Sequence, residues 1–113
     1  MRKIITAAAA IGALAFAIPS SAAGSMLASW YGPGFHGRTT ANGERYDMHG
    51  NSTAHKTLPF GTELRVCYQG CVDVYVNDRG PYIGARELDL SYGAAQAIGM
   101  IDVGVADVTV EYI

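Results

Sequence analysis

Two stretches of the chain alternate strictly between apolar and polar residues, and this period of two is the feature that most restricts the fold. In residues 72–77 every second side chain is a valine, and the positions between are Asp73, Tyr75 and Asn77. Residues 107–112 repeat the pattern with aspartate, threonine and glutamate between the apolar positions. Successive side chains of a β-strand point to opposite faces, so both stretches predict strands with one buried face.

Further strands are expected at residues 27–31 and 63–67, and one helix is expected after Ser91. Ser91 is a favourable N-cap, residues 92–98 contain three alanines, and Gly99 can end the helix in the left-handed conformation. The glycine-rich residues 32–51 show little periodicity, which is typical of a long functional loop. Several short strands with a short helix predict a small, mainly β, closed barrel, because closure removes unpaired strand edges.

The N-terminus has the pattern of a secretory signal peptide. Arg2 and Lys3 precede an apolar run over residues 4–18, and a small-residue cleavage site follows, with Ala22 and Ala23 as equally suitable positions. The run is shorter than the roughly 20 residues of a membrane span, although an uncleaved anchor helix is the alternative. We therefore expect a signal peptide over residues 1–22, an exported domain over residues 23–113, and a periplasmic or extracellular location.

The charge of the exported part excludes some partners. Without Arg2 and Lys3, six basic residues stand against ten acidic ones, which gives a net charge of −4 with histidine neutral. Nucleic acids and anionic lipid surfaces are bound by basic patches, so we expect neither as a partner. The length is enough for one domain, and we expect a monomer.

The two cysteines, Cys67 and Cys71, lie at the ends of two predicted strands with three residues between them. In a cytosolic enzyme this spacing would suggest metal or redox chemistry, whereas in an exported chain a disulfide is favoured. We predict a disulfide that closes a hairpin across its turn, with a redox role as the alternative. The closed loop is short, so the expected stabilisation is only about 2 kcal/mol.

Acidic side chains and one histidine lie at turns between the short apolar segments. They are Glu44, His55, Asp78 and Asp89. Carboxyl groups placed in this way can move protons on and off a sugar substrate. Each also has a purely structural interpretation. Glu44 can be a solvated loop acid, His55 a hydrogen-bonded tie between loop and barrel, Asp78 a turn former, and Asp89 an acceptor for strand or helix amides.

Five ordered motifs resemble the domain of the rare lipoprotein A family. They are residues 28–32 (Ala-Ser-Trp-Tyr-Gly), 40–44 (Thr-Ala-Asn-Gly-Glu), 53–62 (Thr-Ala-His-Lys-Thr-Leu-Pro-Phe-Gly-Thr), 77–81 (Asn-Asp-Arg-Gly-Pro) and 89–91 (Asp-Leu-Ser). The resemblance runs from about residue 28 to residue 113. It implies a six-stranded double-psi β-barrel with one or two short helices, related in fold to expansins and family-45 endoglucanases.

The resemblance also implies a lytic transglycosylase that cuts peptidoglycan glycan strands. Such an enzyme breaks the β-1,4 bond between N-acetylmuramic acid and N-acetylglucosamine without water and leaves a 1,6-anhydro ring. One carboxyl group that begins protonated can serve first as acid and then as base. Glu44, His55 and Asp78 match the positions thought to form the family's active site, and Asp89 matches the catalytic acid of the endoglucanase-type relatives.

Other residues are candidates for substrate binding. Tyr31 and Tyr82 stand beside Gly or Pro turns, where an aromatic ring can serve as a platform for a sugar. Arg79 can hold a carboxylate, either an internal one or the lactyl acid of the substrate. Ser91 is the expected helix cap and also a candidate for contact with the glycan.

Cofactors and anchors are not expected. His36, His49 and His55 have no metal-ligand spacing, so we expect neither a metal nor a cofactor. Members of the family typically carry a lipobox cysteine, and the absence of a cysteine near residues 20–23 leads us to expect no membrane anchor. Two other classes of function remain open: an expansin-like module that binds or loosens wall glycan without cutting it, and a secreted interaction protein such as an inhibitor.

Overall fold

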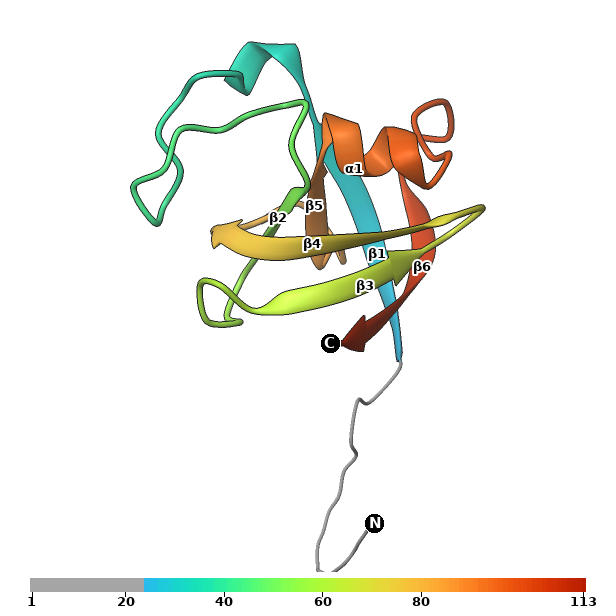
Figure 1. Ribbon diagram of the computed structural model, residues 1–113. Coiled ribbons are helices and arrows are strands. Elements are labelled where there is room, and N and C mark those ends of the chain that lie inside the picture. The colour runs from blue at the N-terminus through green and yellow to red at the C-terminus, as the bar shows by residue number, and fades with distance from the viewer. Residues whose placement is uncertain (1–23) are drawn as a thin grey trace, which may run out of the picture.

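Six strands close into one barrel in the computed structural model, which describes residues 24–113 (Figure 1). The predicted signal peptide, residues 1–22, lies outside the described residues. The strands are β1 (Gly24–Tyr31), β2 (Ser52–His55), β3 (Glu63–Cys67), β4 (Cys71–Asp78), β5 (Leu88–Ser91) and β6 (Ala106–Tyr112). One α-helix, α1 (Tyr92–Ala97), and one 3-10 helix, η2 (Pro33–Phe35), complete the structure. The predicted fold class is confirmed.

The order of strands around the barrel is β1-β5-β2-β4-β3-β6. Two neighbouring pairs, β1–β5 and β2–β4, are parallel, and the other four pairs are antiparallel. β6 lies between β1 and β3, and Val110 is the partner of both Gly24 and Val66. The last strand of the chain therefore joins the first strand, β1, to β3, which comes from the middle of the sequence.

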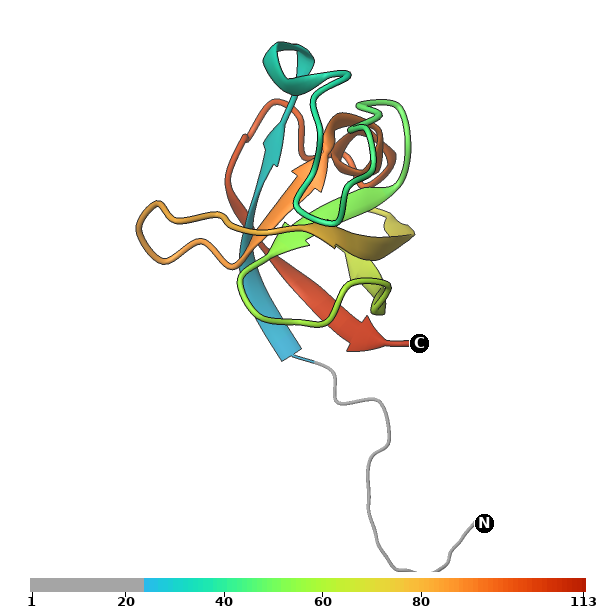
Figure 2. The same ribbon diagram turned by 90° about the vertical axis from the view of Figure 1, so that its left-hand side faces the viewer.

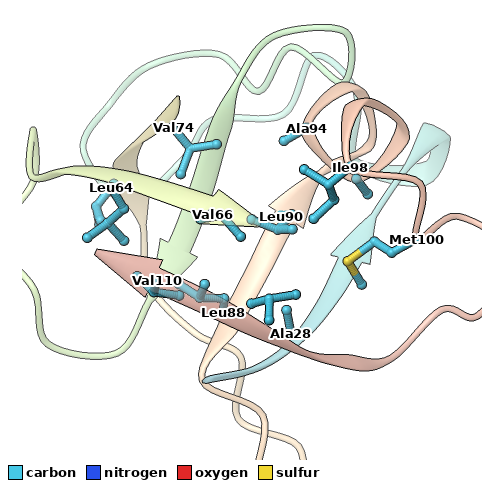
Figure 3. Packing of buried hydrophobic residues seen from close by; sticks show 13 residues of the cluster. Ala28, Leu64, Val66, Val74, Leu88, Leu90, Ala94, Ile98, Met100 and Val110 are labelled. Carbon is cyan, nitrogen blue, oxygen red and sulfur yellow. The ribbon is translucent and has the colours of Figure 1, made fainter. Parts of the chain in front are cut away.

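The core fills the interior of the barrel with branched apolar side chains. Those with at most 4% exposure include Leu64, Val66, Val74, Val76, Leu88, Leu90, Val108 and Val110. Ala94 and Ile98, in and just after α1, join the same cluster together with Met100 (Figure 3). Full burial of one such leucine or valine contributes about 1.5–3 kcal/mol, so the alternating pattern of these strands is what holds the barrel together.

The predicted disulfide is confirmed. Cys67 and Cys71 are cross-strand partners at the end of the β3–β4 hairpin and are bonded to each other. The turn between them also contacts the end of α1, because the amide of Gln69 donates to the carbonyl of Ile98 at 3.0 Å. The hairpin is thus fastened both to itself and to the helix.

The four strands predicted from periodicity are all present, as is the helix after Ser91. The helix ends one residue earlier than expected, and Gly99 closes it with a φ of 77°. Periodicity alone gave no indication of β2 and β5, which have four residues each. Three of the four residues in each are buried, so neither strand alternates between a buried and an exposed face.

Two loops extend from the barrel next to the candidate site. Residues 32–51, in teal and green in Figure 1, form the long loop between β1 and β2. Residues 79–87, in amber and orange in Figure 2, connect β4 to β5 and project from the side of the barrel. The two loops contribute the walls of the pocket described below.

The long loop is fastened to α1 at a point where only glycine fits. The amide of Gly93 donates to the carbonyl of Met48 at 2.7 Å. A Cβ at Gly93 would lie 2.8 Å from the His49 carbonyl oxygen, closer than real Cβ contacts allow. This close approach fixes the end of the loop against the first turn of the helix.

Candidate active site

A pocket of about 380 Å³ opens between the ends of β1, β2, β4 and β5 and the two loops. Its lining residues are Tyr31, Phe35, Ala54, Asp78, Arg79, Gly80, Pro81, Tyr82, Ile83 and Asp89. Four of the sequence candidates, the two aspartates with Tyr31 and Arg79, are therefore together in one cavity, and Tyr82 joins them from the loop of residues 79–87.

The two aspartates face each other across one small residue. Ala54 of β2 is the strand partner of Asp78 on one side and of Asp89 on the other. Neighbouring strands lie about 5 Å apart, so the backbones of the two acids are separated by about 10 Å across the Ala54 methyl group. The strand order β5-β2-β4 brings them together, although they stand eleven positions apart in the sequence. This arrangement leaves space between two carboxyl groups for a ligand.

The pairing of β2 with β4 shifts by one residue at this point. Thr53 is opposite Val76, whereas Ala54 is opposite Asp78, so Asn77 has no partner on β2. A bulge of this kind bends a strand and changes the direction of its side chains, and bulges are frequent next to active sites. Here the bulge stands immediately before Asp78.

Burial distinguishes Asp89 from the other acids. Its position in β5 removes the side chain from water, and this desolvation raises the pKa of Asp89 above its ordinary value. The hydroxyl of Ser29 donates to Oδ1 of Asp89 at 3.0 Å, and this bond and the nearby Arg86 oppose the rise, whereas Asp78 adds to it. Asp89 thus retains its proton to a higher pH than an exposed aspartate, which suits a general acid.

Asp78 is held as a hydrogen-bond acceptor. Its Oδ1 accepts from the backbone amides of Ala41 and Arg79, each at 2.9 Å. The hydroxyl of Tyr31 points at the other oxygen, Oδ2, at 3.4 Å. These three donors fix the direction of the carboxyl group. The amide of Ala41 also connects Asp78 to the loop that carries Glu44.

Tyr31 contributes its hydroxyl group to the pocket more than its ring. The ring stacks on Tyr46 with centroids 4.2 Å apart, and the edge of Phe35 meets it at 5.6 Å. Burial, together with Asp78, raises the pKa of Tyr31, so the hydroxyl stays protonated and can donate. One face of the ring is covered by Tyr46, which leaves Tyr31 a poor platform for a sugar.

Phe35 and Ile83 are lining residues that the sequence gave little reason to select. Phe35 is 48% exposed and Ile83 is 63% exposed, both unusual for large apolar side chains. They stand on opposite loops, with the still more exposed Tyr82 beside Ile83. The exposure of large apolar side chains at a pocket identifies Phe35 and Ile83 as candidates, and only the structure reveals that exposure.

Glu44 lies outside the pocket lining. Its Oε1 accepts from the Tyr75 hydroxyl at 2.9 Å and from Nδ2 of Asn77 at 3.1 Å. These bonds, that of Asn77 first, lower the pKa of Glu44, so it is a charged carboxylate on the surface. It reaches the site indirectly, through the loop whose Ala41 amide holds Asp78.

His55 is also outside the lining, at the end of β2. Its Nδ1 accepts from the backbone amides of Thr57 and Leu58, both at 3.1 Å. Burial lowers the pKa of His55, so the ring remains neutral and can continue to accept these bonds. In this geometry the side chain stabilises the turn after β2, and its backbone carbonyl accepts a bond from Arg79 at 3.2 Å.

Ser91 requires a correction. The structure buries it completely, and its hydroxyl caps α1 by accepting from the amide of Ala94. The same oxygen accepts from the amide of Ser52 and donates to the carbonyl of Gly50. All the bonding capacity of the hydroxyl is used inside the protein, so Ser91 does not reach a bound glycan.

Residues 24–113 offer neither a metal-binding cluster nor a membrane-spanning helix. These residues contain no cluster of three or more histidine, cysteine, aspartate or glutamate side chains that could hold a metal ion. Their helices are all too short to cross a lipid bilayer.

Known sequences that resemble this chain are named as transglycosylases. Residues 21–110 match the family model described as lytic transglycolase. The chain is 52% identical over 90 residues to the endolytic peptidoglycan transglycosylase RlpA of Campylobacter jejuni, covering 77% of this chain and 33% of that protein. The proteins of the same name from Pseudomonas aeruginosa and Vibrio cholerae are 51% identical over 87 residues and 48% identical over 92 residues. These alignments cover 74% and 79% of this chain but only 26% and 35% of the relatives.

Comparison with solved structures identifies the barrel as a double-psi β-barrel. The Streptomyces papain inhibitor superposes with a TM-score of 0.67 at 23% identity, over 86% of this chain and 99% of the inhibitor. An expansin of Clavibacter michiganensis, solved in complex with cellohexaose, gives a TM-score of 0.67 at 20% identity, over 81% of this chain and 50% of the expansin. At these identities the likeness is one of fold.

Proposed function

Because the chain belongs to the lytic transglycolase family, we propose that it cleaves the β-1,4 bond between N-acetylmuramic acid and N-acetylglucosamine in peptidoglycan, without water. The products would carry 1,6-anhydro-N-acetylmuramic acid ends. The observation that supports this most directly is the placement of Asp78 and Asp89 on either side of Ala54 in one pocket. Their environments differ, and acid–base enzymes use such differences to assign separate roles to two carboxyl groups.

Asp89 is the proposed general acid and base. Its raised pKa favours the protonated form, and in this scheme it donates that proton to the glycosidic oxygen as the bond from C1 to this oxygen breaks. The resulting carboxylate then takes the proton of the 6-hydroxyl group on the same muramic acid, and the 6-oxygen forms the new bond to C1. The proton lost by Asp89 is thereby returned, and no water is consumed.

Asp78 is proposed to stabilise the positive charge that develops at C1. Two backbone amides and the Tyr31 hydroxyl hold its carboxylate in place, so little reorganisation is needed during the reaction. Tyr31 is therefore a positioning residue in this scheme. Glu44 and His55 support the loops around the pocket, and Glu44 can meet sugars that extend beyond it.

Tyr82, with Phe35 and Ile83, is proposed to contact the sugar rings. These three side chains form exposed apolar walls on the two loops above the acids. Pyranose rings present flat apolar faces, which pack against aromatic side chains. A wall polymer also requires that the protein act outside the cytoplasm, which agrees with export directed by residues 1–22.

The test is digestion of purified sacculi, with and without stem peptides, by the wild-type protein and by Asp89→Asn and Asp78→Asn. Asp107→Asn is the matched control, because Asp107 is an exposed aspartate on β6, away from the pocket lining. Mass spectrometry should find anhydro ends with the wild-type protein and the control, and should find few or none with either pocket variant. Reducing-end products would instead show hydrolysis.

An expansin-like binding module remains the second candidate, because apolar side chains stand exposed around an open pocket. It predicts no cleavage products. It also predicts that the wild-type protein and both aspartate variants pellet equally with sacculi, while a Tyr82→Ala variant does not. That combination of results would replace the enzyme proposal.

A further inference from the structure

Arg79 is a lining residue of the pocket and follows Asp78 directly in the chain. Its guanidinium group lies over the ring of Phe60, with 3.9 Å between its central carbon and the ring centroid. Its Nη1 donates to the carbonyl of His55 at 3.2 Å. The stacking contact and the hydrogen bond together fix the plane of the guanidinium group. Without such contacts, a long surface side chain has no fixed orientation.

This fixed cation has no acidic partner among residues 24–113. Within residues 24–113, the ion pair that the structure contains is the exposed one between Arg65 and Asp73, at 2.8 Å. The carboxylate of Asp78 accepts from the backbone amide of Arg79 and not from its guanidinium group. Asp89 accepts from Ser29.

A guanidinium group has five N–H donors, and the described hydrogen bonds of this one all start from Nη1. The donors on Nε and Nη2 of Arg79 therefore have no acceptor among residues 24–113. A half-buried cation with unused donors at the wall of a pocket is suited to bind an anion, and a planar carboxylate can accept two parallel bonds from it.

We propose that Arg79 forms an anion subsite that binds a carboxylate carried by the glycan. Since the substrate of the proposed function contains muramic acid, the group that fits is the lactyl carboxylate on the 3-oxygen of that sugar. This inference rests on the proposed function for the identity of the sugar. Without Arg79, the carboxylate of Asp78 would repel such a group, so the subsite would also allow an acidic sugar to lie beside the catalytic acids.

The test compares two forms of the same peptide-free glycan strand. In one form the lactyl carboxylates are intact, and in the other they have been converted to neutral methylamides with carbodiimide and methylamine. The wild-type protein should cleave the acidic strand with a kcat/KM about tenfold higher, as expected for a partly exposed charge-assisted hydrogen bond. Equal cleavage of both forms by the wild-type protein would overturn the proposal, whatever the variants show.

Variants of Arg79 then locate the effect. Arg79→Gln should lower kcat/KM about tenfold on the acidic strand and change it less than about twofold on the neutral strand, and Arg79→Lys should fall between because it keeps the charge without the planar fork. An equal loss on both strands would contradict the proposal, because it would show that Arg79 supports only the loop. Arg45→Gln is the matched control, because Arg45 also donates from Nη1 to a backbone carbonyl, that of Gly37, but lies outside the pocket lining.

A binding measurement separates this inference from the proposed function. N-acetylmuramic acid and its methylamide would be titrated into the wild-type protein and Arg79→Gln, with amide chemical shifts of the pocket residues as the readout. Preference for the acid in the wild-type protein, lost in the variant, would support the subsite even if no strand is cleaved. Binding of both compounds equally, or of neither, would reject it even if cleavage is found.

Discussion

Replacement of Ser91 by alanine should destabilise the protein strongly and leave its chemistry intact. The hydroxyl of Ser91 accepts from the amide of Ala94 at 3.3 Å and from the amide of Ser52 at 3.2 Å, and it donates to the carbonyl of Gly50 at 2.7 Å. The group is fully buried, so water does not replace these bonds in the variant. Ser91→Ala therefore leaves the buried amides of Ala94 and Ser52 and the part-buried carbonyl of Gly50 without their partner.

The size of the effect follows from these three bonds. Loss of a serine N-cap costs about 1 kcal/mol. Each of the other two bonds leaves a buried donor or acceptor unsatisfied, at about 1–3 kcal/mol. Because neighbouring losses are not additive, we expect a decrease in the free energy of unfolding of about 3 kcal/mol. For a domain of this size that corresponds to a decrease in Tm of about 12–24 °C.

Urea unfolding followed by circular dichroism measures the change directly. Ser25→Ala is the control, because Ser25 is exposed on β1, and its replacement should stay within about 0.5 kcal/mol of the wild type. Cleavage of glycan by Ser91→Ala, measured well below its Tm, should equal that of the wild type. A variant of nearly normal stability that has lost binding or cleavage would refute the reasoning and return Ser91 to the substrate-binding residues.

Three further predictions concern the acids and the disulfide. Asp89→Asn should stabilise the protein at neutral pH, because the raised pKa of Asp89 means that the wild-type folded state loses stability as the pH rises through that pKa. The gain in the free energy of unfolding, measured with urea, should vanish below the ordinary pKa of aspartate. A gain that is independent of pH would contradict the raised pKa of Asp89. Ser29→Ala removes the bond that lowers the pKa of Asp89, so the pH above which cleavage declines should move upward; a downward shift would show that Asp89 is not the acid. Removal of the disulfide by Cys67→Ser with Cys71→Ser should cost about 2 kcal/mol in urea unfolding and should not change the pH profile of cleavage; a loss of all structure would show that the bond contributes far more than the closure of a short loop.

The strands that periodicity predicted are those with one face in the core and one face in water. Residues 72–77 and 107–112 belong to this class: Val74, Val76, Val108 and Val110 are buried and Val72 is half-buried. Asn77 departs from the pattern, because it is buried at the bulge. β2, with the sequence Ser-Thr-Ala-His, has no such pattern, because its first three residues are all buried. A strand whose successive residues are all buried carries no alternation that the sequence could reveal.

The candidate acids were identifiable as residues, but their relations to one another were not. Asp78 and Asp89 were both selected from the sequence, yet their meeting across Ala54 depends on the strand order, which no local pattern encodes. Ser91 shows the same limit, because the sequence could not reveal that its hydroxyl group bonds inside the protein. Asp89, two positions earlier on β5, lines the pocket, whereas the hydroxyl of Ser91 forms hydrogen bonds to α1 and to the long loop.

The position of β6 in the barrel bears on how the chain acquires its structure. This strand lies between β1 and β3, and its partners include Gly24 for Val110, at nearly opposite ends of the described sequence. Until residues 106–112 are available, both neighbours keep an unpaired edge, and the barrel cannot close. Folding is then dominated by contacts between distant segments, which makes it slow compared with helical domains of this size. For the export that residues 1–22 predict, this delay would help the chain to stay extended during its passage through a translocation pore. The same delay exposes the edges of β1 and β3 to other chains, so a variant truncated before Ala106 should aggregate or be degraded.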